Sequence, residues 1–292
     1  MEELISVVIP SYNREKTIAK AVDSVLKQTY DNIEVIVVDD CSKDNTVEIL
    51  KQYEDPRLHY YVLDKNSGAC YARNYGISKA KGKYVALHDS DDIWHSDKLE
   101  KQIAYLKKKQ LEFMTCGFIR YRNGKQEKIG MVDCPKNAQD LWCQLVNGNW
   151  VSTQTILCYR YCFEKIQFDP NVKRFQDWEL GLQAAINFRV GSLKETLVDV
   201  YVQEDSITNN QKTYSAICYI LNKHYSDIEP GNQKMLAQWL KSRADAEREV
   251  SLKKAAKFYF QSFCLVRKMK TFASWLMCIT GTMKLYLKHQ DS

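Results

Sequence analysis

Three aspartates lie close together in the stretch Lys83–Trp94, KYVALHDSDDIW. The apolar run Tyr84–Leu87 is typical of a buried strand, and Asp89, Asp91 and Asp92 follow it. If the extended geometry continues, Asp89 and Asp91 project to the same face, where two like charges raise each other's pKa. A divalent cation would relieve this repulsion, and ligands that are all oxygen favour Mg²⁺ or Mn²⁺ over zinc.

A solvated acidic turn is the alternative interpretation of these aspartates. Their position favours a ligand, because open α/β sheets bind ligands just outside the carboxyl ends of their strands. The stretch is therefore a candidate metal site, with Mn²⁺ or Mg²⁺ as the expected cofactor.

Apolar runs alternate with helix-forming segments ahead of this stretch. Strands are expected at residues 5–9, 33–38, 58–63 and 84–87, and helices at 17–27, at 46–53 and between Gly68 and Gly82. Such βαβαβαβ alternation predicts an α/β fold with a parallel sheet covered on both faces. A Rossmann dinucleotide fold needs a glycine-rich turn after its first strand, whereas PSYNREKT follows that strand here, once Pro10 has ended it.

The second half of the chain has a looser pattern. We expect helices at 98–109 and from Phe175 to about Asn187, and strands at 112–121, in pieces of 151–168 and at 197–203. Asn123 and Gly124 predict a hairpin turn.

Composition and charge limit the class of protein. The 292 residues contain no run approaching the ~20 apolar residues of a membrane span, and no secretory signal is expected from MEELISVVIP. Residues 209–292 contain 14 Lys and Arg against 6 Asp and Glu, whereas the remainder contains 28 against 30. The basic excess favours an anionic surface as a partner of this tail, and no nucleic-acid partner is expected.

Five segments occur in an order that is typical of one enzyme family. They are ISVVIPSYNRE, IEVIVVDDCSKDNT, NSGACYARNYGI, YVALHDSDDIW and FQDWELGLQAA. On these motifs, which cover residues 4 to about 208, the chain closely resembles a family 2 glycosyltransferase of the GT-A fold. The resemblance implies a Rossmann-like, mostly parallel central sheet flanked by helices.

The resemblance also suggests a domain division. A catalytic domain would span residues 1–208, with a nucleotide-binding half at 1–100 and an acceptor half at 101–208. Residues 209–292 would form a basic helical extension.

The resemblance assigns nucleotide-sugar binding to residues near the predicted strand ends. They are Pro10, Tyr12, Asp40, Asn66, Arg73, Asp89 and Ser90. Asp40 would accept an imide N–H from uracil or thymine, with a helix-capping role as the alternative. Arg73 would contact the base or the diphosphate, with a surface salt bridge as the alternative.

Asp89-Ser90-Asp91 matches the DXD motif of the family. Asp91 is the expected direct metal ligand, Asp89 would hold the ribose or a metal-bound water, and Asp92 would share the metal role. Asp177 falls at the family's catalytic carboxylate, where a general base takes the proton of an acceptor hydroxyl that attacks the sugar C1. A helix cap is the alternative role for Asp177. A single displacement implies inversion at C1.

Two departures from the family pattern matter. Many relatives have a histidine after the last strand, whereas YVQEDSIT offers Gln203 or Glu204, so the third metal ligand stays open. The QxxRW motif of processive synthases is absent, which favours transfer of one sugar per encounter.

The tail from Lys253 to Lys288 interleaves aromatic and basic residues. This pattern fits an interfacial helix on an anionic membrane. A helix pair packed on the catalytic domain fits it equally well.

The sequence thus predicts a metal-dependent, inverting glycosyltransferase of the hexosyltransferase type. It would move one sugar from a nucleotide-sugar, expected to be a UDP-sugar, to a hydroxyl of a glycan or lipid-linked acceptor in capsule, O-antigen or wall-polymer synthesis. The expected location is cytoplasmic or peripheral at the inner face of the cell membrane. The alternatives are a nucleotidyltransferase, in which Arg14 and Lys16 would grip a triphosphate, and a non-catalytic sugar-nucleotide-binding protein.

Overall fold

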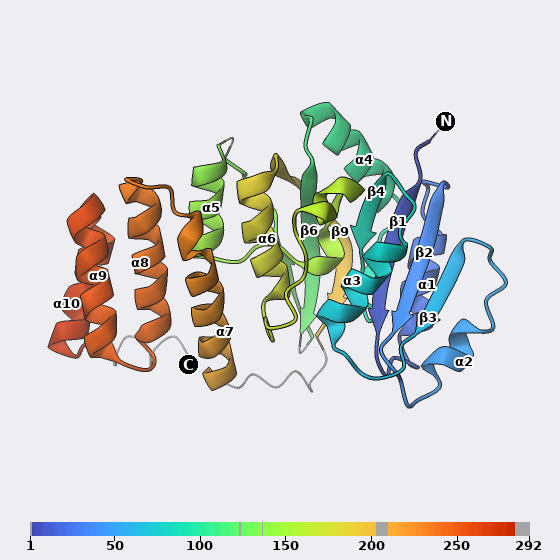
Figure 1. Ribbon diagram of the computed structural model, residues 1–292, viewed down its shortest axis with the longest axis horizontal. Coiled ribbons are helices and arrows are strands. Elements are labelled where there is room, and N and C mark those ends of the chain that lie inside the picture. The colour runs from blue at the N-terminus through green and yellow to red at the C-terminus, as the bar shows by residue number, and fades with distance from the viewer. Residues whose placement is uncertain (1, 123, 136, 203–209, 284–292) are drawn as a thin grey trace. The chain divides into compact units, whose positions relative to one another are not determined.

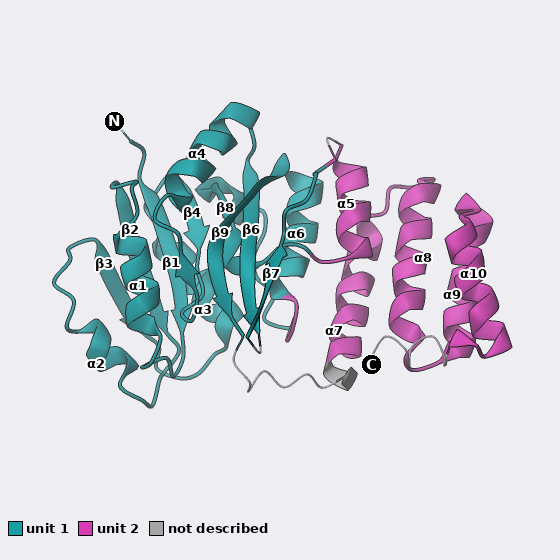
Figure 2. Cartoon of the chain, turned by 180° about the vertical axis from the view of Figure 1, so that it is seen from behind, with its two compact units in different colours: residues 1–134, 150–171, 176–206 teal, residues 135–149, 172–175, 207–292 magenta. Residues whose placement is uncertain are grey.

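The structure, a computed structural model, describes residues 1–292 except 1, 123, 136, 203–209 and 284–292. The chain forms two compact units (Figure 2). The sheet unit comprises residues 1–134, 150–171 and 176–206, and the helical unit comprises 135–149, 172–175 and 207–292. The helical unit therefore includes two segments, 135–149 and 172–175, from within the expected catalytic domain 1–208. The expected domain boundary near residue 208 stays a prediction.

The first half of the sheet unit has the alternation that the sequence predicts (Figure 1). Strands β1 (Ile5–Ser11), β2 (Ile33–Asp39), β3 (Leu58–Val62) and β4 (Tyr84–Leu87) are joined by helices α1 (Ile18–Leu26), α2 (Thr46–Leu50) and α3 (Ala69–Lys79). These strands are parallel, in the order β3-β2-β1-β4. All residues of β1, β2 and β4 are buried, as expected for strands between two layers of helices.

Two predicted boundaries in this half are wrong. Strand β1 continues through Pro10 to Ser11, whereas the sequence predicts that the strand ends before Pro10. The pairing of β4 with β1 stops at Val8, so Pro10 has only β2 beside it, and proline is tolerated at such edge positions. Helix α2 ends at Leu50, before the predicted limit of residue 53.

The second half of the sheet unit extends the same sheet. It contains β5 (Ile93–Trp94), α4 (Lys98–Lys109), β6 (Phe113–Arg122), β7 (Lys125–Ile129), β8 (Leu157–Tyr159), α6 (Gln176–Asn187) and β9 (Val190–Tyr201). The strand order continues from β4 as β8-β6-β9-β5, and β7 pairs antiparallel with β6. Helix α4 and the β6–β7 hairpin confirm the predictions for these segments.

Two predictions in this half were wrong in part. The expected strands of 151–168 reduce to β8, between 3₁₀ turns at Thr153–Thr155 and Arg160–Glu164. Strand β9 begins at Val190, although the sequence predicts residue 197, because its polar first half pairs with β6 in spite of weak β propensity. Its predicted end at Gln203 lies outside the described residues.

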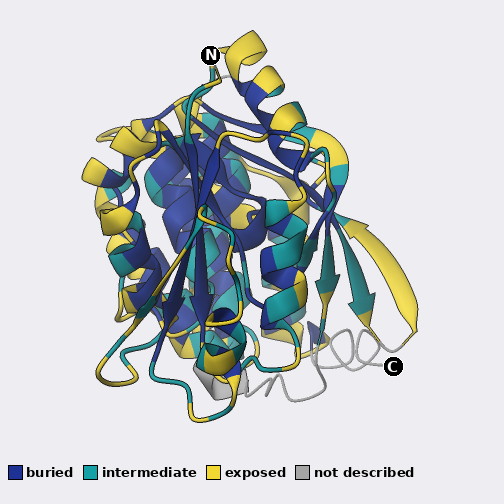
Figure 3. Ribbon diagram, turned by 90° about the vertical axis from the view of Figure 1, so that its right-hand side faces the viewer, coloured by how far each residue is buried: buried dark blue, intermediate teal, exposed yellow. Residues whose placement is uncertain are grey.

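Helices α1 and α3 cover opposite faces of the sheet (Figures 1 and 2), and the strands between them are largely buried (Figure 3). Helix α3 approaches β1 closely at Gly76, where an added Cβ would lie 2.5 Å from Val8 Cγ1. This close packing positions Arg73 on the same helix.

Lys98 is a basic residue in the core of the sheet unit. Its ammonium donates to Gln102 Oε1 at 2.7 Å and lies 3.6 Å from the centre of the Trp94 ring. Burial lowers the pKa of Lys98 from 10.5 to about 8. Between these pH values the unfolded chain holds a proton that the folded protein has released, so this group makes the free energy of unfolding rise with pH.

Replacing Lys98 with Met removes this pH dependence. At each pH, the free energy of unfolding of Lys98→Met is compared with that of the wild type. We expect the difference, variant minus wild type, to be about 2 kcal/mol larger at pH 7 than at pH 10. Urea denaturation of both proteins at the two pH values measures this difference. An equal difference at pH 7 and pH 10 would contradict the assignment of a displaced titration to Lys98.

The helical unit contains α5 (Ala138–Asn147), α7 (Asn210–Lys223), α8 (Gln233–Glu247), α9 (Leu252–Val266) and α10 (Met269–Thr280). Its core includes Ala244, Ala255, Tyr259 and Cys278. Within the described part of the chain, no helix is both long and apolar enough to cross a membrane.

Candidate active site

The candidate site lies where the direction of strand order reverses. The chain passes from β1 through β2 to β3 on one side, and then places β4 on the other side of β1. Ligands of open α/β sheets bind at the carboxyl ends of strands next to such a reversal. Tyr12, Asp40 and Asp89 follow β1, β2 and β4 respectively, so the topology gathers three motifs that are far apart in sequence.

A cavity of about 250 Å³ opens at these strand ends. Seven of the residues that the sequence assigns to donor or metal binding line it: Pro10, Tyr12, Asp40, Arg73, Asp89, Ser90 and Asp91. Arg14, Ser11, Ala69 and Ala72 complete the lining. Asn66 is exposed and is not among the lining residues.

Arg73, on α3, contacts three residues from other segments of the sheet unit. Its Nη2 donates to Asp89 Oδ1 and its Nη1 to Gln176 Oε1, each at 2.8 Å, and its guanidinium lies 5.2 Å from the centre of the Phe168 ring. Arg73 is only 8% exposed, so its pair with Asp89 is not a surface salt bridge. A buried guanidinium bound to a carboxylate fixes the position of Asp89.

Asp40 holds the loop that precedes α3. Its Oδ1 accepts the Ser67 N–H and its Oδ2 accepts the Gly68 N–H, both at 2.7 Å. A carboxylate has about four acceptor positions, so each oxygen retains one for a further donor such as a base imide. The predicted base contact and this loop contact are therefore compatible.

We expect Asp40→Asn to weaken donor binding. An amide oxygen can replace only one of the two acceptors, and its NH₂ faces the other backbone N–H. Loss of a hydrogen bond to a charged group costs about 1.5–3 kcal/mol, or roughly tenfold or more in donor KM. Steady-state kinetics measure the effect, and amide hydrogen exchange at Ser67 and Gly68 reports the loop.

The exposed Asp64 provides a matched control in the same loop. Asp64→Asn removes the same charge without removing an acceptor of either N–H. An unchanged donor KM in Asp40→Asn, or an equal rise in both variants, would contradict the role given to Asp40.

A second cavity of about 540 Å³ adjoins the first, since Arg14, Asp89 and Asp91 line both. Asp92 and Asp177 also line this second cavity. Burial and the Asp89 carboxylate raise the pKa of Asp91, although Arg14 Nη2, 3.5 Å from Asp91 Oδ2, opposes this shift. Burial, Asp89 and Asp91 raise the pKa of Asp92 well above its usual range.

Asp91 and Asp92 are the candidate metal ligands of this cavity. Mutual repulsion and burial disfavour their charged forms, which a bound cation would reverse. Among the described residues, no group of three or more His, Cys, Asp or Glu is arranged to hold a metal ion. Mg²⁺ commonly uses one or two carboxylates and takes its other ligands from water and substrate phosphates, so the acidic set fits such an ion.

Asp177 lies in the first turn of α6 and faces the same cavity as the acidic stretch. Its Oδ1 accepts the N–H of Trp178 at 2.7 Å. A carboxylate at this wall can also meet a hydroxyl that enters the cavity, so this backbone contact does not exclude the predicted base role.

Among the residues of the second cavity that sequence reasoning missed, three have polar side chains. Ser152, Gln154 and Tyr201 line it. Ser152 and Gln154 belong to an irregular segment that was expected to contain strands, and no local motif marks them. Tyr201 ends β9, and its N–H donates to Asp92 Oδ1 at 3.3 Å.

Comparison of the sequence identifies the family. A family model described as "Glycosyl transferase family 2" matches residues 6–135. The Bacillus subtilis protein TuaG, whose name assigns it provisionally to teichuronic acid biosynthesis, is 34% identical over 71% of this chain and 82% of its own length. An uncharacterized glycosyltransferase from Haemophilus influenzae is 30% identical over 80% of this chain and 92% of its own.

Solved structures agree on the fold. The Staphylococcus aureus protein TarS, as a 1–349 fragment in complex with UDP-GlcNAc, matches 98% of this chain and 92% of its own with a TM-score of 0.70 at 20% identity. The mannosyltransferase PcManGT from Pyrobaculum calidifontis, in complex with GDP-Man and Mn²⁺, matches 98% of this chain and 82% of its own. The TM-score is 0.63 and the sequence identity is 18%. The predicted α/β fold with a helical C-terminal region is confirmed, and the chain belongs to glycosyltransferase family 2, with the GT-A fold.

Proposed function

We propose that this glycosyltransferase transfers one sugar from a UDP-sugar to a hydroxyl of a glycan or lipid-linked glycan, with inversion at C1, in the synthesis of a surface polysaccharide. One observation carries the proposal: two cavities meet at Asp89 and Asp91, and Asp177 lies on the wall of the second. The first cavity would take the nucleoside diphosphate and the second the acceptor. The name of one relative supports the substrate class: a UDP-Glc:α-D-GlcNAc-diphosphoundecaprenol β-1,3-glucosyltransferase from Escherichia coli is 44% identical over 111 residues, which are 38% of this chain and 44% of its own.

The donor side is organised around the DXD motif. Tyr12, Asp40 and Arg73 would hold the nucleotide, and Asp89, fixed by Arg73, would face the ribose or a metal-bound water. Asp91, with Asp89 and Asp92, would hold Mn²⁺ or Mg²⁺. When bound, such an ion acts as a Lewis acid that neutralises charge on the departing nucleoside diphosphate.

The acceptor side supplies the base. Asp177 would accept the proton of the acceptor hydroxyl as that oxygen bonds to the sugar C1 and the bond from C1 to the diphosphate oxygen breaks. The electron pair of the broken bond leaves with the nucleoside diphosphate. Attack from the face opposite the leaving group inverts C1, so one carboxylate base is sufficient.

A panel of donors tests the proposed activity. The full chain is incubated with UDP-sugars and GDP-sugars, with Mn²⁺ or EDTA, and with lipid-diphosphate-linked sugar acceptors. Release of UDP together with a glycosylated acceptor is the expected result. Release of pyrophosphate from a nucleoside triphosphate would indicate the nucleotidyltransferase instead, and binding without product would indicate a non-catalytic protein.

We further propose that the helical unit associates with an anionic membrane. Part of the tail is packed within the helical unit, since Tyr259 is fully buried and its hydroxyl donates to Asp245 Oδ1 at 2.6 Å. Other large apolar side chains of α9 and α10 are exposed: Phe260 46%, Met269 71%, Leu276 44% and Ile279 54%. Apolar side chains with basic neighbours favour the surface of an anionic leaflet. Lys284 and Lys288, which the predicted segment includes, lie outside the described residues.

Polar replacement of this face should reduce vesicle binding. We expect the double variant Leu276→Gln/Ile279→Gln to lower partition onto phosphatidylcholine vesicles containing phosphatidylglycerol by about tenfold or more, since each buried side chain contributes roughly 1.5 kcal/mol. Sedimentation with vesicles measures the partition. Val62→Gln is the control, because Val62 is 49% exposed on β3. Equal binding by the double variant would contradict the membrane surface assigned to α10.

A further inference from the structure

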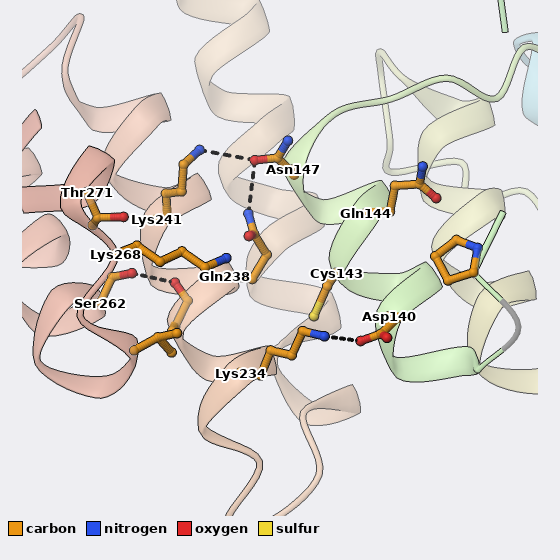
Figure 4. Close-up of a pocket in the computed structure, with 13 residues that line it drawn as sticks. Asp140, Cys143, Gln144, Asn147, Lys234, Gln238, Lys241, Ser262, Lys268 and Thr271 are labelled. Atoms are coloured by element: carbon orange, nitrogen blue, oxygen red, sulfur yellow. Dashed lines mark hydrogen bonds and ion pairs between the residues drawn. The ribbon is translucent and has the colours of Figure 1, made fainter. Parts of the chain in front are cut away.

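The helical unit contains a polar pocket of its own. Its volume is about 430 Å³, and its lining comes from α5, α8, the end of α9 and the start of α10 (Figure 4). Lys234, Lys241 and Lys268 line it, with Asp140 as the one lining carboxylate. None of the lining residues belongs to the donor or acceptor cavities.

Two donors in this pocket have no partner within the described part of the chain. Thr271 is 3% exposed, lines the pocket, and its hydroxyl forms no hydrogen bond there. Lys268 forms no ion pair there, and its side chain extends toward α8 in Figure 4. The rest of the Thr271 side chain is buried, so its hydroxyl is held at the pocket wall and is free to donate to an acceptor that enters the pocket.

The start of α10 adds to the positive potential. Lys268 is the N-cap residue of this helix, and its side chain makes no capping hydrogen bond. The amino end of a helix carries partial positive charge and N–H groups that bind anions. The pocket therefore combines an ammonium, a hydroxyl and a helix amino terminus on one wall.

On the opposite wall, the two lysines already have partners within the protein. Lys234 pairs with Asp140, whose pKa this lysine lowers, and Lys241 Nζ donates to Asp245 Oδ2 at 2.7 Å and to Asn147 Oδ1 at 3.1 Å. Burial raises the pKa of the Cys143 thiol, which therefore adds no negative charge. The lysines of this wall hold fixed positions, and the uncompensated cation is Lys268.

We propose that this pocket binds a phosphate group, presented by a soluble phosphate ester or by a lipid headgroup. A tetrahedral phosphate offers acceptor oxygens in several directions, matching Lys268, Thr271 and the start of α10, whereas a planar carboxylate offers two. The site lies outside the proposed transfer chemistry and does not depend on it.

The first test follows inorganic phosphate by NMR of the full chain, because backbone amides of residues 268–271 report this pocket separately from any phosphate at the donor cavity. We expect saturable shifts at these amides. Lys268→Gln and Thr271→Val should each weaken the affinity by about tenfold, since each removes one hydrogen bond to a charged ligand. Lys270→Gln is the matched control, because Lys270 is exposed beside Lys268 and does not line the pocket.

Vesicles separate the two sources of phosphate. If phosphatidylcholine vesicles with phosphatidic acid bind the wild type better than Lys268→Gln, and phosphate competes, the ligand is a lipid headgroup. If only soluble phosphate depends on Lys268, the ligand is a soluble ester. The absence of shifts at 268–271 with both probes, or equal losses in Lys268→Gln and Lys270→Gln, would overturn the proposal; the exposed Lys268 keeps it testable if Thr271→Val does not fold.

Discussion

Asp177→Asn should lower kcat by about 10²–10⁴ while donor affinity stays at the wild-type level, because the amide cannot accept the proton of the acceptor hydroxyl. The amide oxygen can still accept the N–H of Trp178, which Asp177 Oδ1 now binds at 2.7 Å, so the start of α6 is expected to remain intact. Single-turnover kinetics with a saturating donor isolate the chemical step. Calorimetric titration with UDP measures the donor site independently.

Two comparisons sharpen this prediction. Asp31→Asn removes the same charge from an exposed position before β2, at the opposite end of the strands, and should keep full turnover. Glu179, the other acidic residue of the first turn of α6, is fully buried, and both of its oxygens accept from Gln183 Nε2. Near-normal turnover in Asp177→Asn, with turnover lost in Glu179→Gln, would assign the base to Glu179.

The features predicted well from the sequence are those with strong local signals. Strands β1, β2 and β4 are apolar throughout, and such runs between helices leave little choice except a covered parallel sheet. The motif residues follow the carboxyl ends of these strands, so the parallel topology brings the motif residues together. For that reason, seven of the predicted residues line one cavity.

The features that were missed depend on contacts distant in sequence. The first half of β9 contains Gly191, Ser192, Lys194 and Glu195, and only its pairing with β6 makes it a strand. Ser152 and Gln154 reach the second cavity from a 3₁₀ turn that no hydrophobic period marks. The inclusion of α5 in the helical unit likewise depends on packing against α8, which local pattern does not encode.

Asp91→Asn should abolish the effect of metal on donor binding. We expect wild-type UDP affinity to fall by about tenfold or more when EDTA replaces Mn²⁺, since a charged ligand contact is worth roughly 1.5–3 kcal/mol. In Asp91→Asn the affinity should already be low with Mn²⁺, and EDTA should change it little. Calorimetric titrations of both proteins in both buffers form a cycle that isolates the coupling between Asp91 and the metal.

Thermal unfolding distinguishes loss of a metal ligand from loss of structure. Burial and Asp89 raise the pKa of Asp91 in spite of Arg14, so its carboxylate is unfavourable in the metal-free fold. Metal-free Asp91→Asn is therefore expected to melt at or above the temperature of the metal-free wild type. Mn²⁺ with UDP should raise the melting temperature of the wild type far more than that of the variant. A variant that melts lower without metal would indicate damage to the fold, and equal stabilisation of both proteins would remove Asp91 from the metal site.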